Sequence, residues 1–142
     1  MIIAVDFDGT CVTHEFPKVG KDIGAVPILK ELIEKGHKII LYTMRSHPDK
    51  NNQGKALNGE VIPNDTLKDA IDWFKENEIP LWGINENPKQ KEWTSSPKIY
   101  ANIYIDDAAL GTPLRYDKDG ALSRPYVDWN KIRILLKIKG VL

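Results

Sequence analysis

The chain has 142 residues, of which 42% are hydrophobic and 28% are charged, the balance of a globular domain with one core. Its 20 basic and 20 acidic residues give no net charge, which does not favour general binding to nucleic acid or to anionic membranes. The single Cys11 excludes an internal disulfide and a zinc site built from several cysteines. No apolar run is long enough to span a bilayer, and Asp6 and Asp8 interrupt the N-terminal one, so we expect a cytoplasmic protein.

Two kinds of hydrophobic pattern alternate along the chain. Short apolar runs rich in β-branched residues predict buried strands, whereas apolar residues three and four positions apart predict amphipathic helices. In chain order we expect a strand at 2–5, a loop at 9–21, a helix at 24–35, a strand at 38–43, a polar stretch at 45–61, a helix capped by Asn64 or Asp65, a strand at 81–84, a polar stretch at 85–97, a strand at 101–105, a hairpin within 115–126 and a helix at 128–139.

This alternation predicts the α/β class, a Rossmann-like three-layer α/β/α sandwich with a mostly parallel central sheet in one domain. In such sheets ligands bind beyond the carboxyl ends of the strands. Asp6, Thr43 and Asp106 each stand at the carboxyl end of an expected strand. If those strands are neighbours, the three side chains meet at one rim of the sheet.

Acidic residues dominate this rim. On an extended segment the carboxylates of Asp6 and Asp8 point the same way, and Asp106 and Asp107 add two more acids. Carboxylates packed so closely repel one another unless a cation lies among them, and Mg²⁺ is the cation that oxygen ligands favour. A magnesium site with open positions attracts phosphate, and an aspartate beside it can act as a nucleophile.

Four segments together resemble the motifs of the haloacid dehalogenase (HAD) superfamily, most of whose members are Mg²⁺-dependent phosphohydrolases. D-F-D-G-T at 6–10 is similar to the first motif, and I-I-L-Y-T ending at Thr43 is similar to the second. Lys98 in S-P-K-I-Y is the best match to the motif lysine, and I-Y-I-D-D ending at Asp106 and Asp107 is similar to the fourth motif. The resemblance implies a HAD-like fold and a phosphatase active site.

The resemblance also implies roles for the acids. Asp6 would attack phosphorus and form an aspartyl-phosphate, and Asp8 would protonate the leaving oxygen and then activate water. Metal ligands would come from Asp6, the backbone carbonyl of Asp8 and Asp106, with Asp107 assisting directly or through water. A phosphorylated small molecule is the substrate class that this chemistry implies.

Thr43 and Lys98 would bind the phosphoryl group, according to the same resemblance. Lys89 and Lys91 lie nearby and compete with Lys98 for the role of the motif lysine. Arg45 also follows Thr43 closely, but the sequence favours a solvated loop residue at this position, as it does for His14 and His47.

Members of this superfamily often carry a cap domain over the active site. The loops of this chain are too short to form one, so we expect a single domain over residues 1–142 without a folded cap. The polar stretches 45–61 and 85–97 are the candidate lids, and Trp93 could stack on a substrate. A site this open either admits bulky phosphorylated substrates, among them phosphorylated ends of nucleic acids, or is closed by a partner subunit in a homo-oligomer.

The expected function is therefore hydrolysis of phosphomonoesters, and two alternatives stay open. One is a non-catalytic module that binds Mg²⁺ or phosphate with the same fold. The other is transfer of the phosphoryl group to an acceptor other than water. The presence of both Asp6 and Asp8 argues against a simple binding module, because a binder does not need the acid/base residue.

Overall fold

A computed structural model describes residues 1–48, 58–62, 64–116 and 124–142. Its centre is a four-stranded sheet in the order β3-β2-β1-β4, in which every pair of neighbours is parallel. Parallel neighbours place all their carboxyl ends at the same edge. The strands are β1 at Ile2–Val5, β2 at Lys38–Leu41, β3 at Leu81–Ile84 and β4 at Ile103–Ile105.

In the described part of the chain, three α-helices connect or follow these strands, as the apolar spacing predicts. The carboxylates of Asp65 and Asp128 accept hydrogen bonds from the Lys68 and Lys131 amides, and these caps fix where α2 and α3 begin. Among the described residues, no helix has the length and apolarity to cross a membrane. The helices are α1 at Ala25–Glu34, α2 at Thr66–Glu76 and α3 at Trp129–Ile138.

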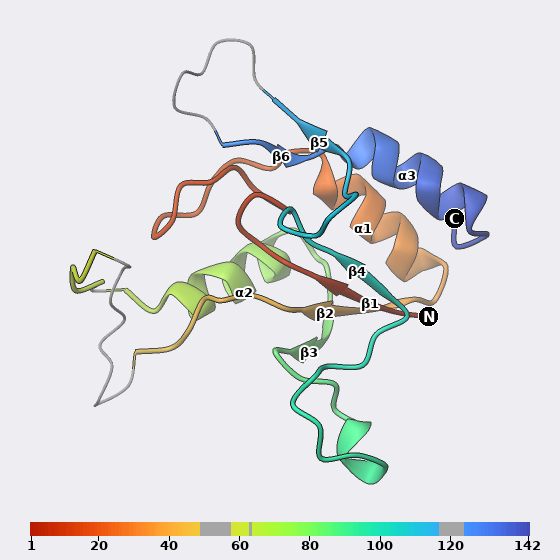
Figure 1. Cartoon of the computed structure of the whole chain (residues 1–142), viewed down its shortest axis with the longest axis horizontal. Coiled ribbons are helices and arrows are strands. Elements are labelled where there is room, and N and C mark those ends of the chain that lie inside the picture. Colours follow the sequence, from red (N-terminus) through yellow and green to blue (C-terminus); the bar gives the residue numbers. More distant parts are fainter. Residues whose placement is uncertain (49–57, 63, 117–123) are drawn as a thin grey trace.

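The two faces of the sheet are covered differently. Ile3 and Val5 of β1 share the main core with the apolar faces of all three helices. Ala4 points to the other face and packs in a smaller cluster with Ile99 and Ala101. The end of the irregular segment 85–101 packs on this second face through Ile99 and Ala101, and the segment extends away from α1 and α3 in Figure 1. The α/β class and the parallel, Rossmann-like sheet are confirmed. The three-layer expectation places helices on both faces, whereas the described α-helices all pack on one face and an irregular segment contacts the other.

Segment 85–101 is stabilised by the buried side-chain amides of Asn87 and Gln90 and by one short helix. The amide of Gln90 donates to the carbonyls of Ser96 and Lys98 and accepts from the backbone N–H of Tyr100. The 3₁₀ helix η1 spans Gln90–Glu92. The chain crosses here from the carboxyl end of β3 to the amino end of β4, which determines where the lysines of this segment lie.

A short antiparallel hairpin follows the sheet and supports its carboxyl edge. It pairs β5 at Leu114–Arg115 with β6 at Tyr126–Val127, as expected for 115–126, while its D-K-D-G turn lies outside the described residues. The Val127 amide donates to the carbonyl of Gly9, and the Trp129 indole donates to the carbonyl of Thr10. The C-terminal part of the chain thus fixes the loop after β1.

Candidate active site

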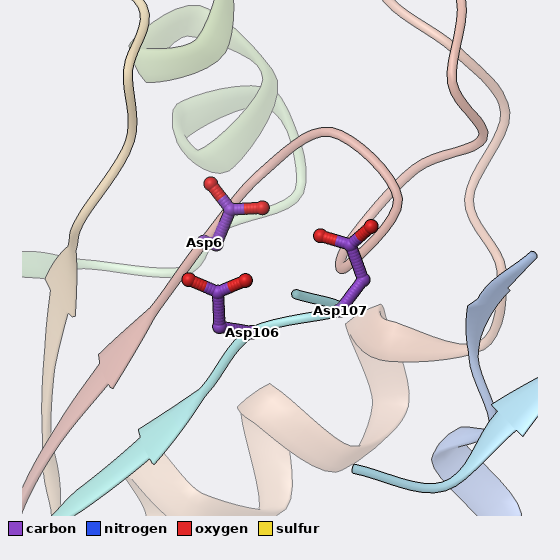
Figure 2. Close-up of side chains that lie close together, drawn as sticks. All are labelled: Asp6, Asp106 and Asp107. Carbon is purple, nitrogen blue, oxygen red and sulfur yellow. The ribbon is translucent and has the colours of Figure 1, made fainter. Parts of the chain in front are cut away.

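Three acidic side chains converge where β1 and β4 end. Asp6 directly follows β1, and Asp106 and Asp107 directly follow β4; the Asp6 amide donates to the Ile105 carbonyl at 3.0 Å and joins the two strand ends. Figure 2 shows the three carboxylates rising from these ends into one space. One oxygen from each lies within 4.8 Å of the others, close enough to share a cation. The structure therefore brings together three of the expected metal ligands.

The loop after β1 turns sharply to present these groups. The Phe7 carbonyl accepts hydrogen bonds from three successive amides, those of Thr10, Cys11 and Val12. The buried Thr10 hydroxyl donates to Oδ2 of Asp6 and accepts from the amide of Asp107, both at 3.0 Å. Thr10 thereby links the first acidic segment to the last, a role that its place in D-F-D-G-T alone does not reveal.

Burial and mutual repulsion change the acidity of Asp6. Loss of hydration is the main reason that the pKa of Asp6 rises from 3.8 to about 7, and the nearby charges of Asp106 and Asp107 raise it further. Hydrogen bonds from the Phe7 amide and the Thr10 hydroxyl act in the opposite direction. Without a cation the site therefore holds a proton on Asp6 close to neutral pH. A bound divalent cation would compensate all three carboxylates at once.

Asp8 is held differently from the three clustered acids. Arg45 donates from Nε to Oδ2 of Asp8 and from Nη2 to Oδ1, both at 2.7 Å, which forms a bidentate ion pair. The expectation that Arg45 is a solvated loop residue is wrong, because only 2% of it is exposed. The carboxylate of Asp8 therefore does not belong to the acidic cluster. The ion pair with Arg45 involves only this carboxylate and not the backbone carbonyl of Asp8.

Thr43 reaches the same rim from β2. Its amide donates to Oδ1 of Asn85 at 2.8 Å, and its hydroxyl accepts from the Arg45 amide at 3.1 Å. Asn85 adopts a left-handed conformation with φ of 50°, directly after β3. The Asn85 side chain thus shapes the end of the neighbouring strand, and the sequence gives no specific signal for this contact.

His14 also lies at the acidic site rather than in solvent. Its Nε2 is 3.0 Å from Oδ2 of Asp107, and only 12% of the side chain is exposed. The contact is an ion pair when the imidazole is protonated. The orientation of the ring does not allow a hydrogen bond from Nε2 to this oxygen. The expectation of an exposed His14 is therefore wrong. His47 agrees better with its expected position, since it is exposed and pairs with Asp65.

A pocket of about 590 Å³ opens above these residues. Lys98 is not part of it, and neither are Lys89 and Lys91. Lys98 lies in the segment that leads to the amino end of β4, where Asn102 bonds to Ile2 at the start of β1. The described residues that line the pocket are Asp6, Asp8, His14, Phe16, Thr43, Met44, Arg45, Asp106, Asp107, Ala108 and Arg124.

The structure bears on one of the two candidate lids. No residue of 85–97 lines the acidic pocket. Trp93 contacts the ring of Tyr100 and does not approach the acids. In the other candidate lid, 45–61, residues 49–57 lie outside the described residues.

Gly9 makes a testable contribution to this geometry. We expect Gly9→Ala to lower the free energy of unfolding by about 2–5 kcal/mol, the sum of left-handed backbone strain and overpacking. Gly9 has φ of 79°, and an added Cβ would lie 2.0 Å from Nε2 of His14 and 2.8 Å from Oδ2 of Asp107. Urea unfolding measures the change.

Gly36 provides a matched control for this substitution. It has the same φ of 79°, but an added Cβ there meets nothing within 4 Å. Gly36→Ala should therefore lose only the strain of about 1–2 kcal/mol. Equal losses at Gly9 and Gly36 would contradict the close approach of His14 and Asp107.

Comparisons with known proteins identify a similar fold but no activity. No family model and no curated protein matches the chain. The chain is similar to the solved structure of a conserved protein from Bacteroides thetaiotaomicron, with 29% sequence identity and a TM-score of 0.69. The match covers 98% of this chain and 91% of the other. The α/β fold is thus shared over almost the whole chain with a protein whose description states no function.

Proposed function

We propose that this protein is a Mg²⁺-dependent phosphomonoester hydrolase of the HAD type, which acts through an aspartyl-phosphate intermediate. The observation that carries the proposal is the convergence of Asp6, Asp106 and Asp107 at the carboxyl edge of a parallel sheet, within 4.8 Å of one another and on a pocket. This is the edge at which α/β proteins bind their ligands.

The donor set fits a hard divalent cation. Asp6, Asp106 and Asp107 offer carboxylate oxygens, and the backbone carbonyl of Asp8 is a further oxygen ligand close by in the chain. The raised pKa of Asp6 agrees with this fit, because its causes are lost hydration and repulsion by Asp106 and Asp107, which a cation would offset. Mg²⁺ would supply charge compensation for a phosphate that approaches these acids.

The chain's own residues would carry out two steps. In the first, a carboxylate oxygen of Asp6 forms a bond to phosphorus, the bond from phosphorus to the ester oxygen breaks, and Asp8 gives that oxygen a proton. In the second, Asp8 takes a proton from water, whose oxygen displaces the carboxylate of Asp6 and releases phosphate. The Thr10 hydroxyl and the Phe7 amide orient Asp6 for both steps.

Cationic and polar groups at the pocket would hold the phosphoryl group. Thr43 lines the pocket, as the resemblance implies, but Lys98 does not. Arg124, two residues before β6, is a cation that does line it. Such a cation matters because the substrate phosphate and an active-site carboxylate carry like charges. At about 4 Å and an effective dielectric of about 20, one such pair repels by roughly 4 kcal/mol. If it were not compensated in the transition state, this repulsion would slow the reaction by about three decades.

Arg124 and Lys98 provide a paired test of this assignment. We expect Arg124→Ala to raise KM for a phosphate ester by about 3- to 10-fold, because an exposed charge contributes about 1 kcal/mol to binding. Lys98→Ala should leave KM and kcat unchanged, since Lys98 is absent from the pocket lining. Steady-state kinetics of both variants measure this, and a larger loss from Lys98→Ala would return the phosphate role to Lys98.

Metal binding should depend on pH with a defined sign. The folded pKa of Asp6, about 7, exceeds its ordinary 3.8, so this group makes the metal-free protein less stable as pH rises from about 4 to about 7. Mg²⁺ needs the carboxylate, so its apparent affinity should fall about tenfold for each pH unit below about 7 and level off above it.

Thermal melts with Mg²⁺ and with EDTA measure this dependence. The rise in Tm on adding Mg²⁺ should be larger at about pH 8 than at about pH 6, because the stabilisation by a ligand grows with the logarithm of its concentration relative to its Kd, and the Kd is lower at the higher pH. Asp6→Asn removes the titrating group and provides the control. A rise in Tm of the same size at both pH values would contradict a metal site that includes Asp6.

Hydrolysis of an aryl phosphate with Mg²⁺ and with EDTA tests the proposed function directly. Activity that depends on Mg²⁺ and is absent in Asp6→Asn would support it. Stabilisation by Mg²⁺ with no hydrolysis of aryl, sugar and nucleotide phosphates would favour the binding module instead. Formation of a new phosphate ester when an alcohol acceptor is added would favour a phosphotransferase.

A further inference from the structure

The guanidinium of Arg45 uses every hydrogen-bond donor that it has. An arginine side chain carries five N–H groups. Nε and one N–H of Nη2 donate to the two carboxylate oxygens of Asp8, and the other N–H of Nη2 donates to the carbonyl of Lys18 at 2.7 Å. Nη1 donates to the carbonyls of Pro17 and Thr66, both at 3.2 Å. No donor is left to bind a phosphate.

Aromatic rings hold the same guanidinium on its faces. Cζ of Arg45 lies 5.0 Å from the ring centroid of Phe7 and 5.3 Å from that of Phe16. With only 1% of its side chain exposed, Arg45 is a desolvated cation, and Asp8 is the anion that compensates it. A planar guanidinium held by five hydrogen bonds and two rings has very little freedom to rotate. It is therefore a fixed partner for the Asp8 carboxylate, which it bonds through both oxygens.

We propose that Arg45 is a positioning residue that fixes the carboxylate of Asp8 for proton transfer to the leaving oxygen, an inference that rests on the proposed phosphatase function. Because Arg45 occupies one lone pair on each oxygen of Asp8, a second lone pair on each remains for the transferred proton. The bidentate bond fixes the plane in which those lone pairs point. Arg45 acts through Asp8 and not on the phosphoryl group.

A purely structural role for Arg45 makes a different prediction. Arg45 joins the loop at Pro17 and Lys18 to the first residue of α2, so its loss could lower activity simply by loosening the pocket. That loss would affect every substrate alike. Loss of proton transfer would affect only those substrates whose leaving oxygen needs a proton, since general acid catalysis is redundant for a good leaving group.

The test compares kcat/KM for an alkyl phosphate and for dinitrophenyl phosphate, whose leaving group departs without protonation. Arg45→Lys keeps the positive charge but loses the planar pair of donors. We expect kcat/KM for the alkyl ester to fall by about 10²-fold, within the usual range for a general acid, and for the dinitrophenyl ester by only a few fold. Asp8→Asn should show the same selectivity.

Arg133→Lys is the matched control. Arg133 makes a bidentate pair with Glu31 at 2.9 and 3.0 Å, and neither residue lines the pocket. Its substitution should leave both kcat/KM values unchanged. Phe16→Leu, which removes a ring from one face of the guanidinium without changing any charge, should give a smaller loss with the same preference for the alkyl ester.

The outcomes separate this proposal from the one on which it rests. Equal losses for both esters in Arg45→Lys and Phe16→Leu would overturn the positioning role and leave the phosphatase intact. If Arg45→Lys failed to fold, equal losses of both activities in Phe16→Leu alone would lead to the same conclusion. Failure of the wild-type protein to hydrolyse either ester would overturn the phosphatase function and, with it, this role of Arg45.

Discussion

Asp6→Asn is expected to abolish hydrolysis, with kcat reduced by about 10⁴-fold or more, equivalent to about 5.4 kcal/mol of transition-state stabilisation. The amide oxygen of asparagine is a weak nucleophile, so no covalent intermediate forms. The substitution also removes one of the three carboxylates that would hold Mg²⁺. Steady-state hydrolysis of an aryl phosphate at saturating Mg²⁺ measures the loss.

Stability distinguishes this loss of chemistry from a loss of fold. In metal-free buffer at about pH 8, Asp6→Asn should raise Tm, because it removes a poorly hydrated charge that faces Asp106 and Asp107. Asp72→Asn is the isosteric control, since Asp72 pairs with Lys68 on the surface of α2 and should affect neither property. Wild-type turnover by Asp6→Asn would reject Asp6 as the nucleophile and the proposed mechanism with it.

Local sequence patterns were sufficient to predict the helices and strands and the acidic residues of the site. Strands 2–5 and 81–84 have the predicted bounds, and Asp65 is one of the two predicted caps of α2. Asp6 and Asp106 could be paired from the sequence because each ends an apolar strand and parallel neighbours end at one edge. Such inferences require only the spacing of apolar residues and the order of the elements along the chain, and both can be read from a single sequence.

The errors concern residues whose environment is set by distant segments. Arg45 and His14 stand in polar loops, and nothing local reveals that Phe7, Phe16 and Asp107 enclose them. A buried arginine needs partners from several places in the chain. Arg45 finds them in the loop after β1 and at the start of α2, so its burial could be known only from the assembled fold.

The lysine and the C-terminal segment illustrate two further limits. Lys98 has a suitable position in the sequence, but the crossing segment carries it toward the amino end of β4 and away from the acids. Trp129 belongs to no motif, yet its indole donates to the carbonyl of Thr10 at 2.6 Å. A motif gives the order of residues along the chain, whereas the path between motifs decides which of them meet.

Asp8→Asn is expected to lose about 10²- to 10⁴-fold in kcat, the usual contribution of a general acid/base. With dinitrophenyl phosphate the first step needs no proton, so Asp6 should still become phosphorylated while its hydrolysis stalls. Mass spectrometry of the stopped reaction should then show one phosphoryl group on the protein, which Asp6→Asn cannot acquire. Full turnover by Asp8→Asn would reject Asp8 as the acid/base.

The stability of Asp8→Asn should change in the opposite direction to that of Asp6→Asn. Asp8 compensates the desolvated charge of Arg45, and removing one partner of a buried ion pair typically costs about 3–5 kcal/mol. Asp6 pairs with no cationic side chain among the described residues and gains stability when its charge is removed. The same isosteric change, made at two positions of one loop, should therefore lower Tm at Asp8 and raise it at Asp6. A fall in Tm at both positions would show that the two acids share one environment and would contradict their separation into a metal ligand and an acid/base residue held by Arg45.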